Sequence, residues 1–553
     1  MDWLLYWSDL GGDRLRGAVL GVTESGPAAA LGAAMIGVRP FPALALPLAL
    51  LAALRLGFWL GAFPNPDEAY YWLWGQHWNL SYFDHPPLQA WGQGAFTALL
   101  GRSNWTLRLP NLISNGLLLG LYAQICHDLY GGRRGVWKLT VLLLFTSPLF
   151  FLFLAFAWHD HWLVLFATTA SYCLMRFLHR YPTGASWGWL YAATLCLGIT
   201  ALCKYLAVFL ALGMVAAIVS YRPWRPLLWD GRFWGGIAIA LLVASPVLVW
   251  NAQNDWASFN FYLGRSVGAQ TSQIRWGAPL EFLLLTGIIF GPIHSWATAQ
   301  VLRQGLGAGF GNTYRRVAIA IFLVSTGCLS LLALKAPVLY YWNILAYPLL
   351  IPLMTGLFIS APSANHRSRY RGGLRAAQII GIGAIAILLV HFTLVPLSAL
   401  IGVDGDEDSR MLFGWKTIGS RIQTEAVALG TDAPLLLTTD YRSASALAYQ
   451  LREPEVMAIS GRRDQFDLWY DAAAMEGRDA LLLGDNWHPI CPTHEAMFDT
   501  TETLDPITIS RFGIFIKRYT LIRGHNFHAG PNDRYPLSPE YPLAFTGDGQ
   551  TCQ

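Results

Sequence analysis

Two short polar motifs near the start of the chain place acidic side chains among aromatic ones. The first spans residues 65–72 (NPDEAYYW) and contains Asp67 and Glu68, and the second spans residues 82–87 (YFDHPP) and contains Asp84 and His85. Only 13% of the residues in the chain are charged. Acidic groups in apolar surroundings are costly and mark functional sites by default, so we expect both motifs to take part in chemistry.

Each motif admits two interpretations. Acids after Pro66 fit the first turn of a helix, where the helix dipole favours negative charge. A carboxylate in an aromatic pocket also has a raised pKa and serves as a general base, which a hydroxyl or amine needs to attack an electrophilic carbon. For Asp84 and His85 the alternatives are a capped turn before two prolines and a site that binds a divalent ion, orients an acceptor or donates to phosphate. We favour function for both motifs.

His159, Asp160 and His161 are consecutive between two apolar segments. The trio has the composition of a zinc site, but adjacent side chains in a turn diverge and rarely bind one ion. Capping of the helix ends is the plain alternative. We expect Asp160 to contact a sugar or the surroundings of Asp67.

Lys204 and Lys335 each follow an apolar run. Lysines at helix ends commonly extend to the water interface, but two of them above an acidic loop suit a phosphate carried by a lipid. Arg265, and with it Arg275, would add bidentate contacts. Together these groups predict one hollow with a carboxylate base on one side and cations for a phosphate leaving group on the other.

The composition indicates a polytopic membrane protein. The chain has 553 residues, of which 54% are hydrophobic, with 24 Trp, 23 Tyr and a mean hydropathy of +0.38. Aromatic residues anchor spans at both lipid–water interfaces. The net charge of +4 is too small to indicate nucleic acid. The sequence has no Gly-rich phosphate loop, HExxH helix or GxSxG elbow, so nucleotide-driven chemistry is not supported.

About eleven apolar segments are long enough to cross a bilayer, which takes about 20 residues each. They run near residues 42–62, 107–129, 138–157, 161–178, 187–203, 205–220, 233–250, 277–302, 317–334, 338–359 and 376–400. Under this count the arginine-rich connections fall on one side, which the positive-inside rule makes cytoplasmic. All the polar groups described above, and everything after about residue 401, then lie on the other face.

The predicted fold class is an α-helical polytopic membrane protein with a small C-terminal extracytoplasmic α/β domain. Residues 1–41 are expected to lead into the first span from the cytoplasm. Residues 42–400 form the transmembrane domain, and its extracytoplasmic loop 63–106 forms short surface helices that break at Pro86-Pro87. Residues 401–553 form the α/β domain, with strands at 433–439 and 479–484 around a helix at 441–452. Cys491 and Cys552 are either bridged there or two unrelated thiols.

The two loop motifs resemble the first extracytoplasmic loop of the membrane glycosyltransferases of the GT-C class. The most similar group is the bacterial relatives of dolichyl-phosphate-mannose–protein mannosyltransferase, which include the lipid A aminoarabinose transferase and the Rgt-type lipopolysaccharide glycosyltransferases. The likeness extends from about residue 60 to residue 350, and the stretch 440–469 also resembles the tails of bacterial members. The double motif is the specific part of the likeness.

The resemblance implies an inverting transfer of a hexosyl or pentosyl group from a polyprenyl-phosphate-linked donor, at the periplasmic face of a bacterial inner membrane. It implies catalytic roles for Asp67 as the base, Glu68, Asp84 and Asp160. It implies that Lys204 and Lys335 bind the lipid phosphate of the donor. We also expect His85, Arg265, Tyr71 and Tyr82 to bind substrate. His85 departs from the aminoarabinose enzyme, which has lysine there. No cofactor is certain, and a divalent cation (Mg²⁺ or Mn²⁺) stays open because members of the class differ.

We therefore predict a glycosyltransferase embedded in the lipid bilayer, with a glycolipid, a polysaccharide or a protein as its acceptor. The alternative is a transporter or flippase of lipid-linked sugars, which would be expected to carry broken helices and charges near mid-span. The gathering of charge at one face favours the enzyme. A scaffold for envelope assembly is a third option, and it would tolerate Asp67→Asn.

Overall fold

The computed structural model describes residues 44–529 apart from residues 134, 267–273, 306–308, 360–363, 404 and 432. The described residues belong to one compact unit. The predicted N-terminal lead-in (residues 1–41) and Cys552 lie outside the described residues. The structure therefore addresses neither the lead-in nor the choice between a bridge and two thiols for Cys491 and Cys552.

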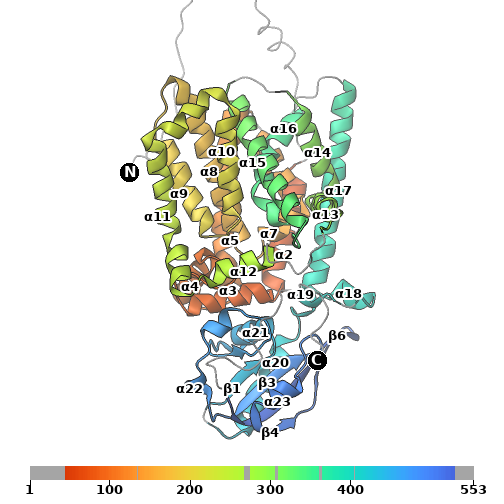
Figure 1. Ribbon diagram of the computed structural model, residues 1–553. Coiled ribbons are helices and arrows are strands. Elements are labelled where there is room, and N and C mark those ends of the chain that lie inside the picture. Colours follow the sequence, from red (N-terminus) through yellow and green to blue (C-terminus); the bar gives the residue numbers. More distant parts are fainter. Residues whose placement is uncertain are drawn as a thin grey trace, which may run out of the picture. The chain divides into compact units, whose positions relative to one another are not determined.

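The first part of the chain is helical (Figure 1). Its α-helices are α2 (Ala45–Gly61), α3 (Pro66–Gln76), α4 (Leu88–Leu100), α5 (Asn104–Tyr130), α6 (Val136–Phe145), α7 (Pro148–Phe153), α8 (Asp160–Arg180), α9 (Gly188–Ala201), α10 (Ala207–Ser220), α11 (Gly231–Gln253), α12 (Ala257–Ser266), α13 (Ala278–Phe290), α14 (Pro292–Arg303), α15 (Gly309–Ala333), α16 (Ile351–Ile359), α17 (Ala364–Thr393) and α18 (Leu397–Leu400). Short 3₁₀ segments are η1 (Tyr181–Thr183), η2 (Arg222–Trp229), η3 (Trp342–Leu345) and η4 (Tyr347–Leu349).

By length and hydropathy, four of the described helical stretches can cross a membrane, or up to seven if each bent helix pair counts as one span. The four are α11, α15, residues 342–359 and residues 368–393. Two shorter apolar helices, α6 and α9, accompany them. These helices fit the predicted polytopic membrane protein, whereas the count of about eleven spans stays a prediction.

Two of the predicted spans are interrupted. The segment 277–302 forms α13 and α14, which meet at 112°. Gly291 has a φ of +117° between them, and Pro292 follows. A left-handed glycine and a proline without an N–H group both end a helix. The segment 138–157 is likewise divided into α6 and α7, and Pro148 is the first residue of α7.

The two helices predicted in loop 63–106 are present as α3 and α4, with Pro86-Pro87 before α4, and their location along the membrane surface stays a prediction. The Asn65 side chain accepts a hydrogen bond from the Asp67 N–H group, and the Glu68 carboxylate accepts one from the Asn65 N–H group, which closes a capping box. A Cβ atom on Gly75 or Gly94 would lie 2.7 or 2.5 Å from the backbone of the facing helix. Only glycine permits so close a contact between α3 and α4.

The C-terminal part carries a mixed sheet. Its helical elements are α19 (Glu407–Arg410), α20 (Trp415–Ala428), α21 (Tyr441–Leu451), η5 (Gln465–Leu468), α22 (Ala472–Met475) and α23 (Pro492–Glu495). Its strands are β1 (Leu435–Thr438), β2 (Met457–Ala458), β3 (Ala480–Asp485), β4 (Phe498–Thr503), β5 (Ile507–Arg511) and β6 (Ile514–Phe527). The strand order is β2-β1-β3-β6-β4, and β5 also pairs with β6.

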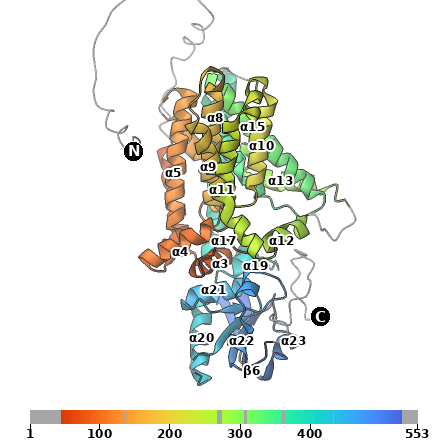
Figure 2. The same ribbon diagram turned by 60° about the vertical axis from the view of Figure 1, so that its left-hand side comes forward.

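The predicted strand–helix–strand unit is confirmed as β1, α21 and β3, and β1 runs parallel to both β2 and β3. The antiparallel half of the sheet, in which β6 pairs with β3, β4 and β5, lies outside the prediction. Helices α3, α4 and α12 lie between the long helices and this sheet in both views (Figures 1 and 2). Buried residues of α3, α20, α21 and β3 form one hydrophobic cluster, so the loop and the C-terminal part share a core.

Candidate active site

Asp67 lies in the first turn of α3 and is half-buried. No other described residue forms a hydrogen bond or ion pair with its carboxylate. Burial raises the pKa of Asp67 to about 7, and the carboxylates of Asp408 and Asp84 add to this, whereas Arg442 and Arg462 lower it. A carboxylic acid that titrates near neutral pH, with its oxygens uncommitted, has the properties of a general base.

Glu68 is fully buried, and both oxygens of its carboxylate accept hydrogen bonds. Arg108 of α5 donates to both of its oxygens at 3.0 and 2.8 Å, with both side chains inaccessible. The backbone N–H groups of Asn65 and Ala157 donate to it as well, each at 2.7 Å. These contacts join α3, α5 and the segment before α8. They give Glu68 a structural role, and the catalytic role expected for it stays a prediction.

Asp84 links the second motif to the C-terminal part. Its carboxylate accepts a hydrogen bond from the Tyr70 hydroxyl at 2.9 Å and forms an ion pair with Arg462. Gln465 extends this contact: its N–H group donates to the Tyr70 hydroxyl at 2.9 Å, and its side chain accepts from the Phe83 N–H group at 2.8 Å. These contacts therefore hold the loop against the segment around residue 462.

Aromatic rings connect Asp67 to the second predicted cluster. The Tyr71 ring, one helical turn after Asp67, lies 4.3 Å from the His159 ring and 5.9 Å from the His85 ring, measured between centroids. The rings of His85 and His159 are 4.7 Å apart. His85 also contacts the Tyr262 hydroxyl through Nδ1 at 3.1 Å. The structure therefore brings Tyr71, His85 and His159 together.

The neighbouring Asp160 is paired with Lys204. The ammonium group donates to both carboxylate oxygens at 2.8 Å, and both side chains are nearly inaccessible. The Tyr341 ring lies 5.2 Å from the same nitrogen. His161 points elsewhere, toward Ser114 and Gln89. The side chains of residues 159–161 thus diverge, as expected for adjacent residues.

Two other predicted substrate-binding residues, Tyr82 and Lys335, make no contact with this centre among the described residues. The buried Tyr82 hydroxyl donates to the Trp74 carbonyl at 2.8 Å, and its ring stacks on Trp74. Lys335 follows α15 and is exposed. The Arg265 side chain lies outside the described part of the structure, and Arg275 faces Glu281 at 3.8 Å. The contacts of Tyr82 with Trp74 indicate that Tyr82 stabilises the turn after α3.

Several charged residues near Asp67 come from the C-terminal part and were not predicted individually. Arg442 lies in the first turn of α21 and contacts Glu407 at 3.2 Å and Asp408 at 3.1 Å. Arg442, Arg462 and Asp408 all shift the pKa of Asp67. For Arg442 and Arg462, the only indication in the sequence is the stretch 440–469, to which the sequence assigns no role.

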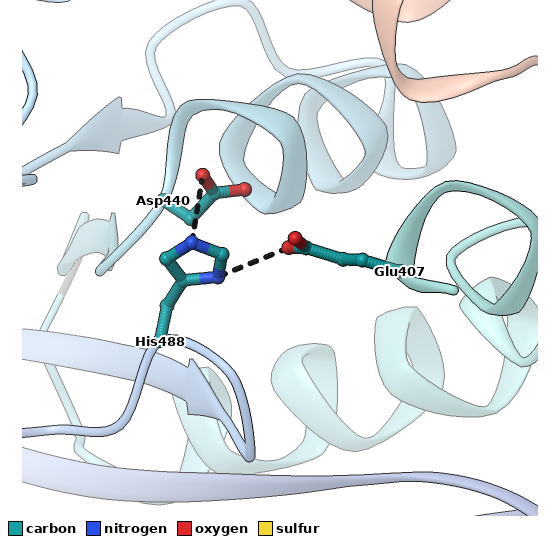
Figure 3. Close-up of side chains that lie close together, drawn as sticks. All are labelled: Glu407, Asp440 and His488. Carbon is teal, nitrogen blue, oxygen red and sulfur yellow. Dashed lines mark ion pairs between the residues drawn. The ribbon is translucent and has the colours of Figure 1, made fainter. Parts of the chain in front are cut away.

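One group among the described residues has the donor set of a metal site. Ligand atoms of Glu407, Asp440 and His488 lie within 4.8 Å of one another. However, Glu407 faces Nδ1 of the imidazole and Asp440 faces Nε2 (Figure 3). A single ion needs one ring nitrogen and both carboxylates on the same side, and Arg442 adds a cation next to them. The arrangement fits an ion-pair cluster.

An apolar cavity of about 50 Å³ lies away from these carboxylates, between α8, α9, α10 and α11. Leu174, Met214 and Phe233 are among its lining residues. Its lining contains no acid or base, so it does not contribute to the candidate active site.

Comparisons with known proteins show what the chain as a whole is similar to. Residues 84–250 match the family model described as dolichyl-phosphate-mannose-protein mannosyltransferase. The chain is 25% identical over 403 residues to lipid A galacturonosyltransferase RgtD of Rhizobium johnstonii, which covers 70% of this chain and 77% of that protein. The matched family segment contains Asp84, Asp160 and Lys204.

The fold is similar to that of ArnT from Cupriavidus metallidurans. The structure of ArnT bound to undecaprenyl phosphate has a TM-score of 0.56 at 17% identity and covers 90% of this chain and 99% of ArnT. The apo structure of ArnT has a TM-score of 0.52, also at 17% identity, with 89% and 99% covered. The resemblance to the GT-C class membrane glycosyltransferases that the two loop motifs predicted is thus confirmed, and this chain has the fold of ArnT.

Proposed function

We propose that this chain transfers a sugar from a polyprenyl-phosphate-linked donor to lipid A or lipopolysaccharide at the periplasmic face of the inner membrane. The acceptor class follows the similarity to a lipid A galacturonosyltransferase. The donor class follows the similarity in fold to ArnT, whose structure holds undecaprenyl phosphate. The comparisons give no support to the alternative of a transporter or flippase.

The observation that carries the proposal is the state of Asp67. Among the described acids of the two loop motifs, Glu68 and Asp84 are ion-paired and Asp67 is not. The pKa of Asp67 is raised to about 7, first by burial. An acid with this pKa exchanges protons readily near neutral pH, which is the requirement for a base that activates a hydroxyl.

In the proposed step, the Asp67 carboxylate takes the proton of the acceptor hydroxyl. The acceptor oxygen attacks the anomeric carbon of the donor, and the bond from that carbon to the phosphate oxygen breaks with inversion. Lys204 stabilises the polyprenyl phosphate that leaves. An ammonium group has three N–H donors, and two of those on Lys204 bind Asp160, so the third is available to a phosphate oxygen.

The decisive experiment compares Asp67→Asn with Asp230→Asn in vesicles that contain donor and lipid A. Asp230 caps α11, and asparagine caps helices as well as aspartate does, so this control should keep full activity. We expect Asp67→Asn to lower the transfer rate by about 10²-fold or more, the contribution of a general base. Mass spectrometry of the acceptor measures the added sugar. Near-normal turnover in Asp67→Asn would exclude the role of base.

Two finer points remain proposals. The periplasmic side is tested by fusing alkaline phosphatase after residue 400, because that reporter folds only in an oxidising compartment. A role for Mg²⁺ or Mn²⁺ is tested by chelation followed by addition of each ion to the transfer assay.

A further inference from the structure

Four charged side chains of the C-terminal part form a closed ring in which positive and negative groups alternate. His488 Nδ1 lies 3.1 Å from Glu407, and Glu407 lies 3.2 Å from Arg442. Arg442 Nε lies 3.7 Å from Asp440, and Asp440 lies 3.7 Å from His488 Nε2. Figure 3 shows three members, with the two ion pairs of the imidazole dashed. We call these four residues the charge ring.

The ring is balanced only if His488 is an imidazolium ion. Burial lowers the pKa of His488, but the carboxylates of Asp440, Asp485 and Glu407 outweigh burial and raise it to about 10. Both ring nitrogens then carry protons, which matches the carboxylate found beside each. Two cations and two anions make up the charge ring at neutral pH.

Hydrogen bonds from backbone N–H groups fix the positions of two members of the charge ring, Asp440 and His488. Asp440 caps α21 and accepts hydrogen bonds from the N–H groups of Arg442 and Ser443. His488 follows Asp485, whose carboxylate binds Lys517 at 2.6 Å and accepts from the His488 N–H group. No backbone group of the described residues binds the side chain of Glu407 or Arg442, so ion pairs hold both side chains in place.

The ring extends toward the proposed base through Arg442. The same Nη1 atom that contacts Glu407 lies 3.1 Å from Asp408. Asp408 raises the pKa of Asp67, whereas Arg442 lowers it. Asp84, Arg462, Tyr71 and Tyr441 also face Asp67, but none of these four belongs to the charge ring.

We infer that His488 is a positioning residue for the transfer reaction: by completing the charge ring it holds Arg442 and Asp408 in place beside Asp67. This inference rests on the proposed function. Without the imidazolium, Glu407 and Asp440 keep Arg442 as the one cation of the ring, and Arg442 is drawn toward them and away from Asp408. The surroundings of Asp67 become more negative, so Asp67 ionises at higher pH.

The test is the pH dependence of transfer in the full-length protein. In His488→Gln we expect the acidic limb of the profile to move up by about one pH unit, a typical difference between protein environments. His488→Lys keeps the positive charge and should return the limb toward that of the wild type. His528→Gln is the matched control, because His528 is an exposed histidine paired with Asp499 and Glu476 outside the ring.

A second variant distinguishes positioning from general damage. Glu407→Gln removes a negative member, so Arg442 is held less by the ring and the limb should move to lower pH. Opposite shifts in the two variants are not expected from loss of structure. An unchanged limb in both would overturn the inference. If Asp67→Asn itself keeps the acidic limb of the wild type, the proposed function fails instead.

Discussion

The two neighbouring acids at the start of α3 lie in opposite surroundings. On one side, Glu68 is enclosed by Arg108 and two backbone N–H groups, and its charge is fully compensated. On the other side, Asp67 faces charged side chains of the C-terminal part and has no ion-pair partner among the described residues. A compensated charge stabilises the fold, whereas an uncompensated one remains available for chemistry. Four experiments can break or sharpen this contrast.

The largest effect is expected from Arg108→Met, which leaves Glu68 buried without its partner. Breaking a buried ion pair on one side costs about 3 to 5 kcal/mol of stability, so most of the protein should fail to fold or unfold at markedly lower temperature. Thermal unfolding followed by tryptophan fluorescence measures this. Arg232→Met, at an exposed pair with Asp230, is the control and should leave the transition unchanged. A stable Arg108→Met protein would contradict the structural role of Glu68.

Lys204 tests the cationic side of the site. We expect Lys204→Met to raise the KM for the donor by about 10- to 100-fold, since a hydrogen bond to a charged group contributes about 1.5 to 3 kcal/mol. Combining it with Asp160→Asn avoids an unpaired acid and keeps the protein folded. Lys335→Met removes an exposed lysine and should have the smaller effect. If donor affinity is unchanged in both lysine variants, neither lysine holds the phosphate.

The pH dependence of stability tests Asp67 without any substrate. Because burial raises the pKa of Asp67 to about 7, the unfolded chain releases this proton between pH 4 and pH 7 while the folded protein retains it. Stability of the wild type therefore falls over this range, and Asp67→Asn should not show that fall. The variant should be as stable as the wild type near pH 4 and more stable at pH 8. Equal stability at both values would show that the Asp67 pKa is ordinary.

The smallest effect is expected from Arg462→Gln, which removes the ion pair between Asp84 and the C-terminal part. We expect amide hydrogen exchange at residues 82–85 and 460–469 to speed up about fivefold, corresponding to roughly 1 kcal/mol, with the thermal transition nearly unchanged. Mass spectrometry of peptides measures the exchange. Unchanged exchange in both segments would show that Tyr70 and Gln465 hold the contact without the ion pair.

The parts of the structure that were predicted correctly depend on local patterns. The start of α3 follows from Asn65-Pro66, since capping needs only neighbouring residues. The strand–helix–strand unit follows from apolar runs around an amphipathic segment. The interruption of α13 and α14 also had a local signal in Gly291-Pro292, but the high hydropathy of the segment favoured a single span.

The partners of the acids were not predictable in the same way. Asp84 and Arg462 are 378 residues apart in the chain, and Gln465 and Tyr70 are 395 residues apart. A sequence pattern shows that a charge is present but not which opposite charge the fold places next to it. For this reason the sequence assigns Glu68 to catalysis along with the base Asp67, and it does not single out Arg442.

The sequence alone determined that the chain is a polytopic membrane protein with an acidic, aromatic loop and a C-terminal α/β part, because hydropathy and local propensity act over short distances. The tertiary structure alone decided which carboxylate stays unpaired. That choice depends on contacts between α3, α5 and α21, and electrostatic energy depends on distances in space rather than on positions along the chain.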